Sequence, residues 1–99
     1  MILVRDIFRV RFGMMRDALA ALKAAEPLLA QESVRPDSRI LTDLTGPYYT
    51  LVLESTFVDL AAWETYSKEG MSSPEWKDWY HRFSANIESG HREIMTIVA

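Results

Sequence analysis

Charged side chains on expected strands are the first residues of this chain that could do chemistry. Arg9 and Glu54 fall on two segments expected to be neighbouring strands of one sheet. This placement is typical of a cross-strand ion pair, and the same two groups could anchor a small acid. Asp6 interrupts a strand face that is otherwise apolar, so its burial would be costly without a partner or water. Asp6, Arg9 and Glu54 are therefore candidates for a binding site, with structural ion pairing as the open alternative.

Aromatic side chains supply the other candidates. Trp63 and Tyr66 lie three residues apart on a short expected helix, and Tyr49 lies on an expected strand. A tryptophan can form the wall of a pocket for a flat ligand, although large rings more often pack in the core. We predict a core position for Trp76. Trp63, Tyr66 and Tyr49 are candidates for ligand binding, with structural roles for the tyrosines as the open alternative.

The two histidines do not indicate a catalytic or metal site. His81 lies about 140° from the centre of the apolar stripe on its expected helix, so we predict that it is exposed. His91 follows Gly90 and is expected in an exposed turn. The chain has no cysteine, and neither histidine has a second ligand at helical spacing. We therefore expect no metal site and, without a glycine-rich phosphate loop, no cofactor.

Length and charge limit the classes of protein that remain. The chain has 99 residues, which predicts a single domain over residues 1–99. The net charge is −3 and the basic residues are scattered, which argues against binding to nucleic acid. Charged residues break the apolar N-terminus early, and no segment is long and apolar enough to span a bilayer. We expect a soluble cytoplasmic protein with no membrane partner.

The elements that must position these residues follow from hydrophobic periodicity and from turn signals. The predicted strands cover residues 2–12, 38–45, 48–57 and 92–98. A first helix over residues 14–32 is expected to break near Pro27, because proline lacks a backbone donor. A second helix starts near Asp59 and ends at Gly70 as a left-handed cap, and a third runs from Ser73 to residues 89–90.

This order of elements predicts an α+β fold of the ferredoxin-like βαββαβ type. Its four-stranded antiparallel sheet has the helices on one face, and the other face is bare. Leu3, Ile7 and Val52 are expected on the bare face, which is too apolar for open water. We therefore predict a homodimer in which two sheets cover each other.

A family resemblance rests on three short segments. These are Thr42-Asp43-Leu44-Thr45-Gly46-Pro47 with the strand after it, Trp63-x-x-Tyr66, and Pro74-Glu75-Trp76. They resemble the NIPSNAP family of the dimeric α/β-barrel superfamily, over roughly the C-terminal two-thirds of the chain. The resemblance implies a homodimeric α/β barrel and assigns no reaction. Heme-degrading and monooxygenase members of the superfamily use an asparagine on the first strand, whereas Asn86 here is expected on the last helix.

Three functions remain open from the sequence. The first is an uncharacterised dimer of NIPSNAP-like type that binds a small hydrophobic or aromatic molecule. The second is a cofactor-free monooxygenase-like enzyme that acts on an aromatic or polyketide-like substrate. The third is a non-catalytic module for dimerisation or regulation. A pocket lined by Trp63 and a tyrosine would favour the first two, and a filled interior the third.

Overall fold

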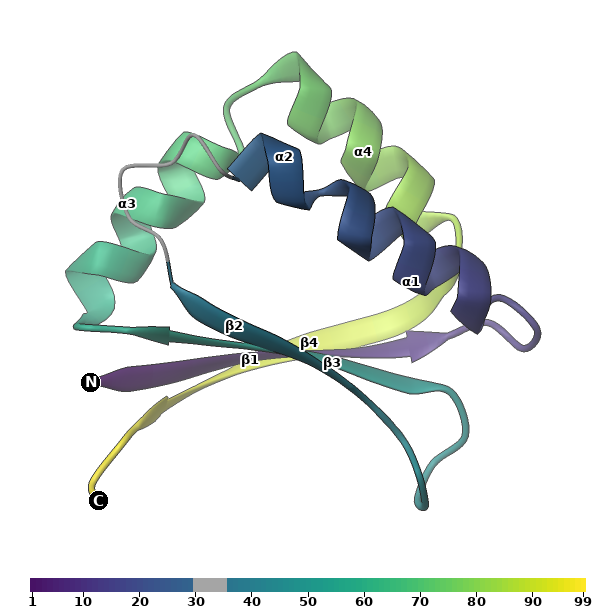
Figure 1. Ribbon diagram of the computed structural model, residues 1–99, viewed down its shortest axis with the longest axis horizontal. Helices are drawn as coiled ribbons and strands as arrows, with labels where there is room; N and C mark the ends of the chain where they lie inside the picture. The colour runs from purple at the N-terminus through teal and green to yellow at the C-terminus, as the bar shows by residue number, and fades with distance from the viewer. Residues whose placement is uncertain (30–35) are drawn as a thin grey trace.

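The sheet and its helices form two layers in the computed structural model, which describes residues 1–29 and 36–99 (Figure 1). The elements along the chain are β1 (Ile2–Val10), α1 (Met15–Ala24), α2 (Glu26–Leu29), β2 (Asp37–Thr42), β3 (Thr50–Phe57), α3 (Leu60–Gly70), α4 (Pro74–Ser84) and β4 (Ile87–Thr96). The antiparallel sheet has the strand order β2-β3-β1-β4, and Figure 1 shows the helices on one face only. The predicted ferredoxin-like α+β fold is confirmed.

The predicted break of the first helical segment near Pro27 is confirmed, and it occurs at Ala25. α1 ends at Ala24, and the amide of Ala25 donates back to the carbonyl of Leu22 at 3.2 Å. Pro27 then lies in the first turn of α2. Backbone amides in the first turn have no acceptor within the helix, so the absence of an N–H at Pro27 costs no helical hydrogen bond. The end of the predicted segment, near residue 32, lies outside the described residues.

Two caps hold the helices that follow β3. The carboxylate of Asp59 accepts a hydrogen bond from the amide of Ala62 at 2.8 Å, and the hydroxyl of Ser73 accepts one from Trp76 at 3.1 Å. Both are the N-caps expected from sequence. The left-handed cap predicted at Gly70 is wrong, because positive φ among the glycines occurs only at Gly13 and Gly46.

α4 ends earlier than the predicted residues 89–90. The helix ends at Ser84, and Asn86 lies in the turn after it rather than on the helix. β4 already begins at Ile87 and runs through Gly90, which lies opposite Phe8 of β1. A Cβ atom at position 90 would lie 3.0 Å from Cδ1 of Phe8, so Gly90 makes room for a neighbouring ring and does not end a helix.

The core fills one end of the space between helices and sheet. The indole of Trp79 stacks on Phe83 at 5.2 Å between ring centroids, and Phe8 meets Phe83 edge-on at 5.1 Å. The indole nitrogen of Trp79 donates to the carbonyl of Ala21 at 2.5 Å, which joins α4 to α1. The buried members of this cluster are Val10, Ala18, Leu22, Ala25, Leu51, Trp79 and Phe83.

A row of alternating charges crosses all four strands on the face away from the helices. In strand order its members are Arg39, Glu54, Arg5 and Glu93. Glu54 accepts from Arg39 at 2.7 Å and from Arg5 at 2.9 Å, and Arg5 also donates to Glu93 at 2.9 Å. The predicted pairing of Glu54 with Arg9 is therefore wrong. Arg9 is exposed opposite Thr50, because the antiparallel register places Arg5 beside Glu54.

Glu54 is the buried member of this row. Its side chain is 8% exposed, and the two arginines lower the pKa of its carboxyl against the opposing effect of burial. The hydrogen bond from Arg39 is the largest contribution. A lowered folded-state pKa means that Glu54 stabilises the fold above its unfolded pKa, and that this contribution is lost as the pH falls through the folded value.

We predict that Glu54→Gln lowers the free energy of unfolding by about 1–2 kcal/mol at neutral pH, because both arginines lose a charged acceptor. The difference from the wild type should begin to shrink as the pH falls below the ordinary carboxyl value of 4.5, and should vanish below the lowered pKa of folded Glu54, where the wild-type side chain is also neutral. Urea denaturation over a pH series measures it, with the exposed Glu88→Gln as control. A difference that stays constant across the series would contradict the assignment.

Candidate functional site

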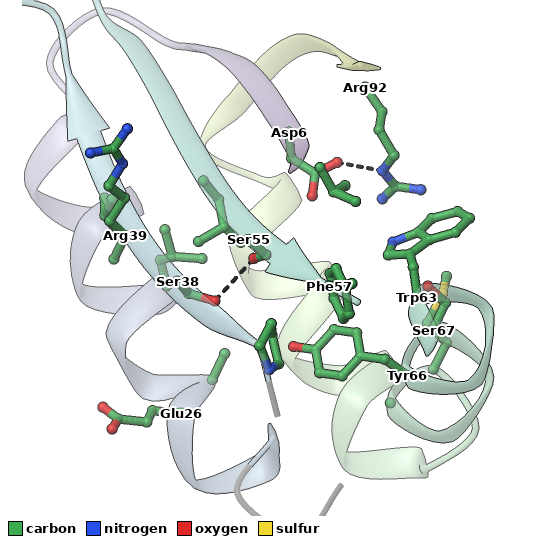
Figure 2. A pocket seen from close by; sticks show the side chains of 18 of the residues that line it. Asp6, Glu26, Ser38, Arg39, Ser55, Phe57, Trp63, Tyr66, Ser67 and Arg92 are labelled. Carbon is green, nitrogen blue, oxygen red and sulfur yellow. Dashed lines mark hydrogen bonds and ion pairs between the residues drawn. The ribbon is translucent and has the colours of Figure 1, made fainter. Parts of the chain in front are cut away.

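A cavity of about 520 Å³ lies between the helices and the sheet, at the end that the core does not fill (Figure 2). Its floor includes Val4, Leu53 and Phe57 of the sheet, and α3 and α4 contribute its aromatic wall. The lining is mostly apolar, and the volume falls within the range of sites for small molecules.

The aromatic wall follows from the way α3 begins. The Asp59 cap fixes the start of this helix, and Trp63 and Tyr66, three residues apart, then share the face directed at the sheet. Tyr66 packs against Phe57 at 5.3 Å between ring centroids. Trp76 of α4 also lines the cavity and lies 4.7 Å from Trp79 of the core. Trp76 is half-buried, so the prediction of a core residue holds only in part.

Asp6 has the partner that its place on an apolar face required. It lies opposite Arg92 of β4, whose Nε donates to its Oδ1 at 2.5 Å. The guanidinium carbon of Arg92 lies 5.2 Å from the ring centroid of Trp63, within the range of a cation–π contact. Asp6, Arg92 and Trp63 thus form one polar and aromatic corner of the cavity.

Arg92 is a cavity residue that the sequence did not indicate. The final strand was predicted to begin at this residue, which gives no register against Asp6. The observed register, with Asp6 opposite Arg92, depends on β4 beginning five residues earlier at Ile87. An arginine at a strand position opposite the lone carboxylate was the available signal.

Two serines provide the other polar feature of the lining. Ser38 and Ser55 face each other across β2 and β3, with their hydroxyl oxygens 3.0 Å apart. Figure 2 shows this pair on the other side of the cavity from Trp63. Arg39 also borders the cavity, but its guanidinium is bound to Glu54 on the outer face. Polar side chains of the lining therefore also occur away from the Asp6–Arg92 pair.

The remaining predicted site residues lie elsewhere. Glu54 belongs to the charge row on the outer face, and Arg9 is exposed. Tyr49 packs edge-on against Phe12 at 5.0 Å, beside a separate hollow at the far end of the sheet. Of the six candidates, the structure brings together Asp6, Trp63 and Tyr66 around the cavity, and places Arg9, Tyr49 and Glu54 outside it.

The histidines do not approach the cavity. His81 is exposed on α4, as predicted. His91 is exposed within β4 rather than in a turn, and its Nε2 lies 4.0 Å from a carboxylate oxygen of Glu93. In residues 1–29 and 36–99 no three potential ligand side chains are grouped to hold a metal ion. No described helix is long and apolar enough to cross a membrane.

The fold is shared with solved structures of low sequence identity. An uncharacterised NIPSNAP domain protein from Burkholderia xenovorans superposes with a TM-score of 0.87 at 15% identity, over 100% of this chain and 96% of that one. A NIPSNAP family protein from Agrobacterium tumefaciens gives 0.87 at 18% identity, over 98% and 85%. SnoaB, a cofactor-independent oxygenase from Streptomyces nogalater, gives 0.76 at 11% identity, over 99% and 93%.

The comparisons by sequence add no further relative, because no family model and no curated protein matches the chain. At these identities the structural matches establish the fold alone. The likeness to NIPSNAP proteins that the three sequence segments indicated is thus confirmed at the level of the fold, and the oxygenase is the more distant match.

Proposed function

We propose that this protein binds a small, flat, largely apolar molecule in the cavity beneath α3. The observation that supports the proposal is a cavity of about 520 Å³ with Trp63, Phe57 and Tyr66 in its wall. Rings of this kind offer a large contact area to an aromatic ligand at little cost in side-chain entropy. A module that served only for dimerisation would have no need of an open interior, so the cavity favours binding over that alternative.

Naphthalene is a suitable probe because it offers a flat ring system without a polar group. We predict that it shifts the indole N–H signal of Trp76 in NMR titrations, and that Trp63→Ala weakens its binding about tenfold through loss of the stacking surface. The matched control is Tyr80→Ala, which removes an exposed ring from α4 outside the cavity. Equal affinity in both variants would contradict binding beneath α3.

The proposed binding protein is a homodimer that forms through the outer face of the sheet. Leu3 and Ile7 of β1, Val52 of β3 and Met95 of β4 share this face with the charge row, and Figure 1 shows no helix over it. The two arginines and two glutamates of the row already balance each other, so covering them leaves no unmatched charge. Burial of the surrounding apolar groups would stabilise the pair of sheets.

Light scattering at micromolar concentration should give twice the mass of one chain. Met95→Asp places a charge among the apolar groups of the outer face and should return the mass to that of a single chain. Tyr80→Asp, on the helical layer, is the control and should leave the dimer intact. A wild-type protein with the mass of one chain would overturn this part of the proposal.

A second candidate function is cofactor-free oxygenation of an aromatic or polyketide-like substrate. It is supported by the fold shared with the cofactor-independent oxygenase and by the tryptophan-lined cavity. We expect any such activity to appear as oxygen uptake when an aromatic quinol is added, and to fall in Trp63→Ala. No uptake above the level without protein would leave ligand binding as the function and exclude oxygenation of that substrate.

A further inference from the structure

The Asp6–Arg92 pair leaves hydrogen-bonding atoms open to the cavity. Arg92 uses Nε to reach Oδ1 of Asp6, and the described residues provide no hydrogen bond to its two Nη atoms or to Oδ2 of Asp6. The side chain of Asp6 is 20% exposed and that of Arg92 is 49% exposed. The buried side-chain oxygens and nitrogens in residues 1–29 and 36–99 all have a hydrogen-bond partner. Because Oδ2 of Asp6 has no such partner, it is not a buried atom and is accessible. The pair thus presents an acceptor and a donor side by side.

Among the described residues, the cation beside Trp63 is not free for an anionic ligand, because Asp6 neutralises Arg92. Lys23 and Glu26 carry opposite charges on the exposed part of the lining. The guanidinium of Arg39 is held by Glu54 on the outer face. A carboxylate brought to Arg92 would lie close to the Asp6 carboxylate and would lose its water, and both effects disfavour it.

Trp63 aligns a ligand ring with this pair. The guanidinium of Arg92 lies over the indole, and Figure 2 shows Asp6 and Arg92 on the side of the cavity nearest Trp63. A ring that packs beside this indole therefore lies close to the pair.

We propose that the ligand class is a neutral aromatic molecule with one hydroxyl or amide group, which donates to Oδ2 of Asp6 and accepts from an Nη of Arg92. This inference rests on the proposed binding function and names the polar group that the site selects.

Three probes that share one ring system test the inference, namely naphthalene, 2-naphthol and 2-naphthoate. At neutral pH the first has no polar group, the second is a neutral donor and acceptor, and the third is an anion. We expect 2-naphthol to bind about tenfold more tightly than naphthalene, because it gains hydrogen bonds to charged groups. 2-Naphthoate should bind more weakly than either. An affinity for 2-naphthol no higher than for naphthalene, or a preference for 2-naphthoate, would overturn the inference.

Two variants test whether the preference for 2-naphthol depends on the Asp6–Arg92 pair. Asp6→Asn removes the negative charge beside Arg92, so 2-naphthoate should overtake 2-naphthol. Arg92→Gln removes the donor charge and should bring 2-naphthol close to naphthalene. The matched controls are Asp78→Asn and Arg82→Gln, which alter an aspartate–arginine pair on the surface of α4. Each cavity variant must fold, as judged by its amide NMR spectrum. A preference for 2-naphthol over 2-naphthoate kept in Asp6→Asn, or a tenfold advantage of 2-naphthol over naphthalene kept in Arg92→Gln, would contradict the assignment.

The same titrations separate this inference from the proposed function. Naphthalene binding that depends on Trp63, with no advantage for 2-naphthol, would retain the function and reject the ligand class. Failure of all three probes to bind the wild-type protein would reject both.

Discussion

The register of β1 between β3 and β4 is the constraint on which both faces of this protein depend. It places Arg5 between Glu54 and Glu93 on the outer face, and Asp6 opposite Arg92 beneath the helices. Because successive strand residues point to opposite faces, a slip of one residue would exchange the two sets of side chains. One alignment therefore determines both the ion pairs of the outer face and the polar corner of the cavity.

The cavity results from unequal packing along the sheet. At one end Trp79 and Phe83 fill the space between α1, α4 and the sheet, and the bond from Trp79 to Ala21 fixes the two helices together. At the other end α3 contacts the sheet through the ring of Tyr66 on Phe57 and through Trp63 beside Arg92. The well-packed end supplies stability, so the other end can remain open for a ligand without loss of the fold.

Local signals in the sequence predicted the elements, and long-range pairing determined the site. The caps at Asp59 and Ser73, and the periodicity of the strands, act over a few residues, so the βαββαβ order and the positions of Trp63 and Tyr66 could be predicted. The pairing of Glu54 with Arg5 and of Asp6 with Arg92 depends on the lengths of turns and on where β4 begins. No local pattern specifies these quantities, which is why Arg9 was assigned to Glu54 and Arg92 was not recognised.

The contact between Phe8 and Gly90 links two positions that are far apart in the chain. A Cβ atom at position 90 would crowd the ring of Phe8 and the backbone oxygen of Ile7, which lies 3.1 Å from the site of that atom. A smaller residue at position 8 would relieve only the first of these contacts. Position 90 is therefore constrained by the main chain of β1 as well as by a side chain, so a substitution at position 8 alone does not free it to accept a larger residue.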